Sequence, residues 1–230
     1  MIDNDSQQAC KTCNHAVEAF ANAKILGKYN ITYYRCQHCG FIQTAAPYWL
    51  EEAYARPIAA EDVGLVARNL RLAQKTRVIL GTLFDPGGKF LDYGGGYGLF
   101  VRLMRDYGFD FYRYDKYTPG IFSRGFNVDR TGHYEVITAL EVIEHLVDPI
   151  GELKRMREMS RSILFSTRLV PDPPPKPDEW WYYGVNGGQH IAFYTLRTLR
   201  VIADEFGLRL YSNGTNLHLL TPRDFPGIVF

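Results

Sequence analysis

The chain has 230 residues, which is enough for one large domain or for one domain with a small appendage. With 46% hydrophobic and 22% charged residues it is not a disordered chain, and 26 Lys and Arg against 25 Asp and Glu give a net charge of +1. This balance argues against an electrostatic tether to nucleic acid or to an anionic membrane. The N-terminus lacks a signal-peptide pattern and no apolar run reaches about 18 residues, so we expect a cytoplasmic protein without a membrane span.

All four cysteines lie in the first forty residues, as two CxxC pairs separated by 22 residues. In a reducing compartment such pairs favour a metal over a disulfide. Two thiolates at i and i+3 fit one side of a tetrahedral Zn²⁺, and Gly40 permits the tight turn that this needs. We expect residues 1–46 to form a zinc-ribbon-like segment with a closed, structural Zn²⁺ site, a disulfide or a redox pair being the alternatives. The expected ligands are Cys10, Cys13, Cys36 and Cys39.

Residues 48–84 have helical periodicity and end at a turn, so that 47–85 reads as a helical linker. From residue 86 to 230 strands and helices alternate, which predicts one α/β domain with a mostly parallel sheet covered on both faces. A hairpin signal, Asn213-Gly214, predicts an antiparallel pair of strands at the end. The expected strands are 90–91, 109–114, a segment near 127–128, 134–139, 162–166, 208–212 and 217–220; the expected helices are 99–107, 150–159 and 196–206.

A glycine cluster follows the first of these strands and precedes a helix, in the segment Leu91–Leu99. Closely spaced glycines let the backbone approach a ligand and turn sharply into the helix. The spacing fits neither the dinucleotide fingerprint nor a P-loop. What stands here is acid-x-G-x-G-x-G, with Asp92 as the acid.

This pattern resembles the first motif of the class I S-adenosylmethionine-dependent methyltransferases. Asp115, 17 residues past Gly98, stands where that family places the acid that binds both ribose hydroxyls. Residues 134–149 are similar to the family's fourth-strand segment, with Glu135 in place of the common Asp. The resemblance implies a Rossmann-like sheet, S-adenosylmethionine as cofactor, and a contact of Asp129 with the adenine amine. The cofactor-binding residues that it implies are Asp92, Gly94, Gly95, Gly96, Gly98, Asp115, Asp129 and Glu141.

The N-terminal cysteine segment followed by Pro47–Tyr54 is similar to a subgroup of sugar and small-molecule methyltransferases, many of them in polysaccharide or natural-product biosynthesis. The implied reaction is O-methylation of a hydroxyl of a sugar, a polysaccharide or another small metabolite. Three alternatives stay open. They are methylation of a protein or nucleic acid recognised through the zinc segment, a non-catalytic zinc-ribbon interaction protein, and a nicotinamide oxidoreductase, which the failed fingerprint weakens. Homo-oligomerisation also stays open.

An alcohol acceptor needs its proton removed, which requires a positioned base. His190 lies in a stretch, H-x-x-F-[FY], that lines the substrate cleft in related enzymes, and we expect it to be the general base or an acceptor-binding residue. His145 is the second candidate, and a reaction without a single base is the third. The pattern Glu141-x-x-Glu144-His145 differs from a zincin helix, because Glu141 stands where that helix needs a histidine, so we expect no metal there.

Five prolines within residues 171–177 predict an extended loop, and four large aromatic residues follow it. Contiguous large aromatics cannot all enter one core, so we expect some of them to form a platform on which a sugar or nucleoside stacks. The alternative is packing into the core or an oligomer contact. The expected substrate-binding residues are Trp180, Trp181, Tyr182, Tyr183, Phe193 and Tyr194.

Overall fold

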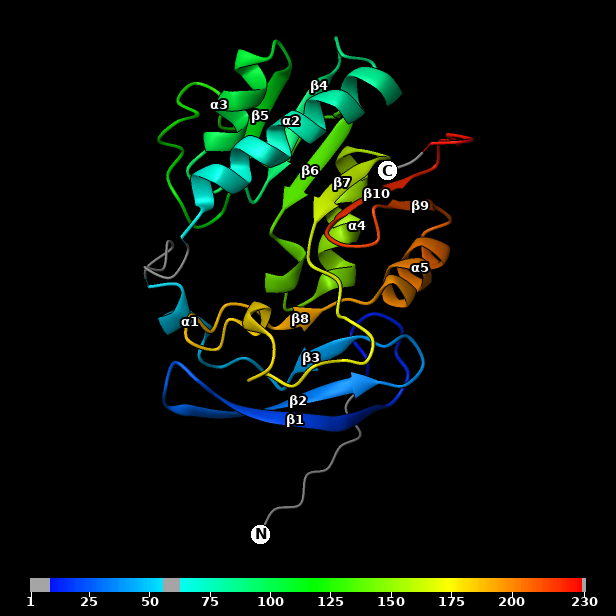
Figure 1. The fold of residues 1–230 in the computed structure, drawn as a ribbon. Helices are drawn as coiled ribbons and strands as arrows, with labels where there is room; N and C mark the ends of the chain where they lie inside the picture. The colour runs from blue at the N-terminus through cyan, green and yellow to red at the C-terminus, as the bar shows by residue number, and fades with distance from the viewer. Residues whose placement is uncertain (1–8, 56–62, 229–230) are drawn as a thin grey trace.

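The computed structural model describes residues 9–55 and 63–228, which form two sheets (Figure 1). The larger sheet has the order β5-β4-β6-β7-β10-β9 and the smaller has the order β1-β2-β3-β8. The larger consists of β4 (Lys89–Tyr93), β5 (Asp110–Tyr114), β6 (Val136–Leu140), β7 (Ile163–Ser166), β9 (Arg209–Ser212) and β10 (Leu217–Thr221). The smaller consists of β1 (Val17–Ile25), β2 (Tyr29–Cys36), β3 (Ile42–Thr44) and β8 (Ala192–Phe193).

Five α-helices accompany the sheets in the described ranges: α1 (Leu50–Ala53), α2 (Leu65–Leu83), α3 (Leu99–Asp106), α4 (Pro149–Met159) and α5 (Leu196–Glu205). The predicted helical stretch 48–84 therefore contains α1 and α2, and its residues 56–62 lie outside the described part of the chain. None of the helices in the described ranges is both long and apolar enough to cross a membrane. The boundaries at residues 46 and 85 stay a prediction.

The larger sheet confirms the prediction of a mostly parallel sheet with an antiparallel C-terminal hairpin. β4 runs parallel to β5 and β6, and β6 runs parallel to β7. β10 runs antiparallel to both β7 and β9. The strand expected near residues 127–128 is wrong: only a bridge between Arg113 and Asn127 forms there, because the chain leaves the edge of β5 after pairing with this single residue.

Alternate residues of the central strands enter two different cores, as the period of a strand requires. Phe90 of β4 packs with residues of α2 and α3, whereas its neighbour Leu91 packs with residues of α4 and α5. Figure 1 shows α2 and α3 over one face of the sheet. The predicted coverage of both faces is thus confirmed, and it explains why the strands are apolar on both sides.

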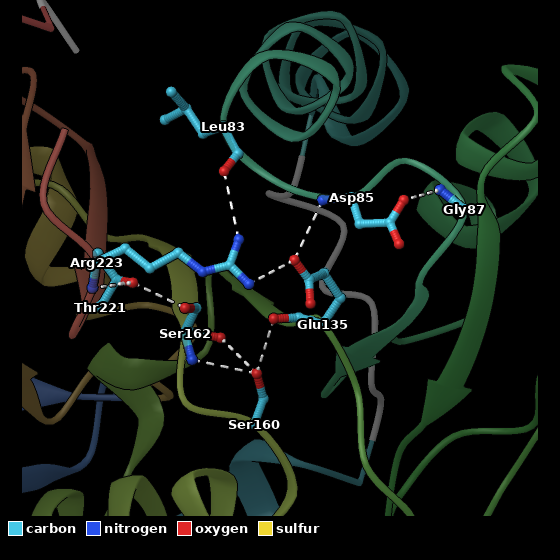
Figure 2. A network of polar contacts seen from close by, with 8 residues as sticks. All are labelled: Leu83, Asp85, Gly87, Glu135, Ser160, Ser162, Thr221 and Arg223. Carbon is cyan, nitrogen blue, oxygen red and sulfur yellow. Dashed lines mark hydrogen bonds and ion pairs between the residues drawn. The ribbon is translucent and has the colours of Figure 1, made fainter.

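A polar network closes the end of the larger sheet at which β4 and β6 begin (Figure 2). The guanidinium of Arg223 donates to the carbonyl of Leu83 at the end of α2 and to Glu135 just before β6, at 3.4 and 2.7 Å. Glu135 also accepts from the backbone of Asp85 at 3.2 Å. Glu135 therefore has a structural role at the edge opposite to the glycine turn.

His218 of β10 is a fully buried histidine with a partner on each ring nitrogen. Its Nε2 lies 3.1 Å from the carbonyl oxygen of Thr167, and its Nδ1 lies 2.8 Å from the hydroxyl of Ser212. Because a carbonyl only accepts, Nε2 carries the proton and Nδ1 accepts from the serine. Burial lowers the pKa of His218 to about 4, so the folded chain holds this ring neutral.

His218 should make the fold sensitive to acid. Between its ordinary pKa of 6.5 and its folded pKa of about 4, the unfolded chain binds a proton that the folded chain does not, so stability falls as pH falls. The free energy of unfolding should drop by about 2 kcal/mol between pH 7 and pH 5 through this residue. Urea titrations at both pH values should show a smaller drop in His218→Gln. An equal drop in wild type and variant would contradict the assignment.

Candidate functional site

The glycine turn joins the carboxyl end of β4 to the start of α3. Gly94 and Gly95 donate their backbone N–H groups to the carbonyl of Tyr114 at 2.8 and 3.2 Å, which holds the turn against β5. Gly94 has φ +70°, and a Cβ there would lie 2.8 Å from the side chain of Val142. The turn therefore needs glycine, and it lies directly beside the loop that follows β6.

Asp115, at the end of β5, lies against this turn. One carboxylate oxygen accepts from the backbone of Gly96 at 2.9 Å, and the other accepts from the backbone of Tyr117 and Thr118, each at 2.8 Å. Three N–H donors thus orient the carboxylate, and a carboxylate has further lone pairs for hydroxyl donors. The structure brings Asp115 and the glycine turn together, as the sequence motif predicts.

Asp92 is buried against the glycine turn. It is 2% exposed, and it accepts from the hydroxyl of Thr138 at 2.7 Å. A Cβ on Gly95 would lie 2.6 Å from its carboxylate, so the acid and the turn are in close contact. Burial raises the pKa of Asp92 to about 7, although the hydrogen bond from Thr138 acts in the opposite direction.

A buried arginine that the sequence analysis missed supports the same turn. Arg113 of β5 is 4% exposed, and its guanidinium donates to the carbonyl of Gly96, to Asn127 and to both the carbonyl and the hydroxyl of Thr118. It also lies 3.8 Å from Asp115. The only signal in the sequence is a charged residue inside an apolar strand, two positions before that acid.

The loop after β6 carries two acidic residues of different surroundings. Glu141 has φ +55°, a conformation that costs energy in a residue other than glycine, and its carboxylate accepts from the hydroxyl of Ser166 at 2.6 Å. Glu144 is fully buried and accepts from the hydroxyl of Tyr182 at 2.6 Å. Burial is the main cause that raises the pKa of Glu144, and the negative charge of Glu141 is the second cause.

Both histidines of interest lie beside Glu144. The rings of His145 and His190 meet edge to face, with centroids 4.8 Å apart. Nδ1 of His145 lies 3.0 Å from the hydroxyl of Tyr54, and Nδ1 of His190 lies 2.6 Å from the carbonyl of Tyr182. Burial is the main cause, and the charge of His190 the second cause, of a pKa of His145 well below its ordinary value. The ring of His145 is therefore neutral at neutral pH.

Tyr54 links the histidines to the glycine turn, and the sequence analysis gave it no role. Its ring stacks on Tyr117, with centroids 5.5 Å apart, and Tyr117 in turn donates its backbone N–H to Asp115. Together with the contact between Gly94 and Val142, this places the glycine turn, Asp115 and the two histidines along one edge of the larger sheet.

The aromatic residues expected to bind substrate lie mostly in the core. Tyr182, Tyr183, Phe193 and Tyr194 are at most 1% exposed. Tyr194 donates to the carbonyl of Ile143 at 2.8 Å and so supports the loop after β6. Trp181 is 72% exposed and lies under the guanidinium of Arg168, whereas Trp180 lines a separate hollow of about 650 Å³. A direct contact with substrate stays a prediction for all six, and the two tryptophans are the accessible ones.

Asp129, the residue expected to bind the adenine amine, lies in an exposed loop after the bridge between Arg113 and Asn127. Its carbonyl accepts from the backbone of Thr131 at 2.8 Å. Its contact with a cofactor stays a prediction.

The four cysteines meet at one point, although they come from two turns. The sulfur–sulfur distances are 3.6 Å for Cys10 and Cys39, 3.5 Å for Cys13 and Cys36, and 3.5 Å for Cys13 and Cys39. Four sulfurs about 2.3 Å from one Zn²⁺ would lie about 3.8 Å apart, so the group fits a tetrahedral ion after a small expansion. The four could therefore hold a metal.

A family model described as a methyltransferase domain matches residues 66–213, which excludes the cysteine segment. No curated protein sequence matches the chain. Among solved structures, 1,6-didemethyltoxoflavin-N1-methyltransferase of Burkholderia thailandensis, with bound 1,6-didemethyltoxoflavin and S-adenosylhomocysteine, is 13% identical with a TM-score of 0.57. The match covers 87% of this chain and 97% of that one.

An O-methyltransferase family protein of the same organism is 15% identical with a TM-score of 0.53, and the match covers 77% of this chain and 63% of that one. The chain spans 54% of CalO1, a methyltransferase of calicheamicin biosynthesis solved with SAH (16% identity, TM-score 0.48, 66% of this chain). At such identities the likeness concerns the fold, which is the Rossmann-like methyltransferase fold.

Replacing Arg113 should destabilise the chain, because the carbonyls of Gly96 and Thr118 would lose their buried donor. Arg113→Met should lower the free energy of unfolding by about 3 kcal/mol, measured by urea denaturation. Arg102→Met, on the exposed side of α3, is the matched control and should cost less than about 1 kcal/mol. Equal losses in the two variants would show that Arg113 has no special role.

Proposed function

Because this chain belongs to the methyltransferase-domain family, we propose that it transfers a methyl group from S-adenosylmethionine to a hydroxyl of a small metabolite such as a sugar or glycan. One observation carries the proposal: the glycine turn and the Asp115 carboxylate meet at the edge of the sheet where the loop after β6 presents Glu144 and His145, with His190 of the segment before β8 beside them. In open α/β sheets, ligands bind at the carboxyl ends of the strands.

The cofactor fits the first part of this edge. Asp115 would accept hydrogen bonds from the ribose hydroxyls, while the backbone of the turn at Gly94–Gly98 would approach the methionine part. Arg113 donates to the carbonyl of Gly96 in the turn. The turn is therefore held in place by the chain itself before a cofactor binds. When bound, S-adenosylmethionine supplies a methyl group on a positively charged sulfur, ready for in-line displacement.

The acceptor side needs a group that takes up or stabilises the hydroxyl proton. His190 is the proposed residue, as base or as binding group, and His145 is the second candidate. The carbonyl of Tyr182 fixes the proton of His190 on Nδ1, so Nε2 has a lone pair in the neutral ring. The ring of Tyr182 packs 4.7 Å from the ring of His190 and shields this side from water.

We also propose that the four cysteines bind a structural Zn²⁺. The sulfur spacing supports this, and a closed four-thiolate shell leaves no position for chemistry. The carbonyl of Cys39 accepts hydrogen bonds from the hydroxyls of Thr195 and Thr198 at the start of α5, both at 2.9 Å. The ion would therefore act through the position of the segment before α5.

Two variants separate binding from chemistry. Asp115→Ala should weaken S-adenosylmethionine at least tenfold by calorimetry, whereas His190→Ala should leave the affinity within about twofold and abolish turnover. Turnover is followed as the mass gain of one methyl group in a panel of nucleotide sugars and glycans. Asp106→Ala, an exposed site on α3, is the control for Asp115. Absence of cofactor binding in the wild type would sink the proposed function, and unchanged turnover in His190→Ala would sink the role of that residue.

Metal analysis of the purified protein should find one Zn²⁺ per chain. Cys36→Ser should lose the ion and lower the melting temperature, because the binding free energy of a structural site contributes to folding. His38→Ala, at an exposed ring that stacks on His15 beside the site, should retain it. A wild-type protein without zinc, or loss of zinc in His38→Ala, would contradict the four-cysteine site.

A further inference from the structure

We propose that the hollow lined by Trp180 binds the diphosphate group of a nucleotide. Its volume of about 650 Å³ lies within the range of small-molecule sites. Among the described residues, its lining includes none of the glycine turn and neither histidine of the candidate site, so it is a separate place on the molecule. Three basic residues line it, and they are Arg35, Arg168 and Arg197.

The three arginines come from segments that are far apart in the sequence. Arg35 is on β2, Arg168 follows β7, and Arg197 is in the first turn of α5. Arg35 shares a face of β2 with the fully buried Tyr33, because side chains of a strand alternate. The loop after β7 runs from the larger sheet to the smaller one (Figure 1), which brings Arg168 and Arg35 to one hollow.

The positive charge of these arginines has no acidic partner in the described part of the chain. None of the three forms an ion pair there. Glu18, the cross-strand neighbour of Arg35, accepts instead from Gln37 at 3.0 Å. Nε of Arg35 is buried and has no hydrogen-bond partner. A buried N–H donor without a partner is costly, so the hollow is suited to a ligand that accepts hydrogen bonds.

A diphosphate has the charge and the geometry for this lining. A guanidinium presents its N–H groups in a planar fork that fits phosphate oxygens. Thr195 and Leu196 at the start of α5 also line the hollow, and the N-terminus of a helix favours an anion. Asp172 is the one acidic residue in the lining, so the three arginines leave an excess of positive charge that a diphosphate offsets.

Trp180 adds an aromatic wall to the same hollow. Its ring is half-buried and packs against the rings of Tyr182 and Tyr183, with centroids 5.1 and 5.6 Å away. Nucleobases of every kind stack on aromatic side chains. A nucleoside diphosphate therefore uses both the arginines and the tryptophan, whereas inorganic pyrophosphate uses the arginines alone. This inference rests on the hollow and not on the proposed function.

The test is a calorimetric titration of the purified protein with UDP and with inorganic pyrophosphate, without cofactor or acceptor. We expect one UDP per chain and weaker binding of pyrophosphate. Arg35→Gln and Arg197→Gln should each weaken both probes about tenfold, because a charged donor to phosphate is lost. Arg200→Gln, an exposed position on α5 that does not line the hollow, should bind both probes as the wild type does.

Trp180→Leu separates the ring from the phosphates. It should weaken UDP about fivefold or more and leave the affinity for pyrophosphate unchanged, which also shows that the variant is folded. If it does not fold, the difference between UDP and pyrophosphate in the wild type decides. Saturating S-adenosylhomocysteine should leave the affinity for UDP unchanged, because the hollow is separate from the glycine turn.

No binding of UDP by the wild type up to millimolar concentration would overturn the proposal. So would unchanged affinity in both arginine variants, or competition between UDP and S-adenosylhomocysteine. Equal affinity of the wild type for UDP and pyrophosphate would contradict the assignment to a nucleotide. A protein that binds UDP in this way but does not bind S-adenosylmethionine would support the hollow and contradict the proposed methyltransferase activity.

Discussion

The short segment from Gln189 to Thr195 is the constraint on which the candidate site depends, because it joins the two sheets. On one side the backbone of Ile191 donates to Glu144 after β6, and on the other the backbone of Thr44 donates to Ile191. β8 continues this contact by pairing with β3. His190 is therefore held between the larger sheet, which carries the glycine turn, and the smaller sheet, which the N-terminal residues build.

The cysteine cluster lies outside the candidate site but holds one end of the segment from Gln189 to Thr195. The carbonyl of Cys39 accepts hydrogen bonds from the hydroxyls of Thr195 and Thr198. Thr195 is the N-cap of α5. A Cβ on Gly40 would lie only 3.0 Å from Thr195, so the knuckle and the helix start are in tight contact. The N-terminal segment therefore packs directly against the start of α5 beside the four cysteines.

Local sequence patterns predicted the parts of the fold that depend on local chemistry. The strand–glycine turn–helix unit, the acid at the end of β5, the closing hairpin and the clustering of four cysteines all follow from spacing and turn residues. The pairing of β8 with β3 could not be predicted, because two residues carry no periodicity and their partner lies about 150 positions away.

Burial of Tyr182 and Tyr183 within the aromatic run could not be predicted either. Trp180 to Tyr183 read as too large a group for one core, yet Tyr33 of β2 and Phe193 of β8 receive Tyr183 at ring distances of 5.1 and 4.5 Å. This third core lies between the smaller sheet and the loops and is visible only once both sheets are assembled.

The central claim is that the glycine turn and the Glu144–His145–His190 cluster face one common site. A crystal structure with S-adenosylhomocysteine tests it most directly. The account predicts the ribose hydroxyls on Asp115 and the cofactor sulfur directed toward the cluster. Density for the cofactor with its sulfur directed away from the cluster, or bound away from the glycine turn, would contradict it.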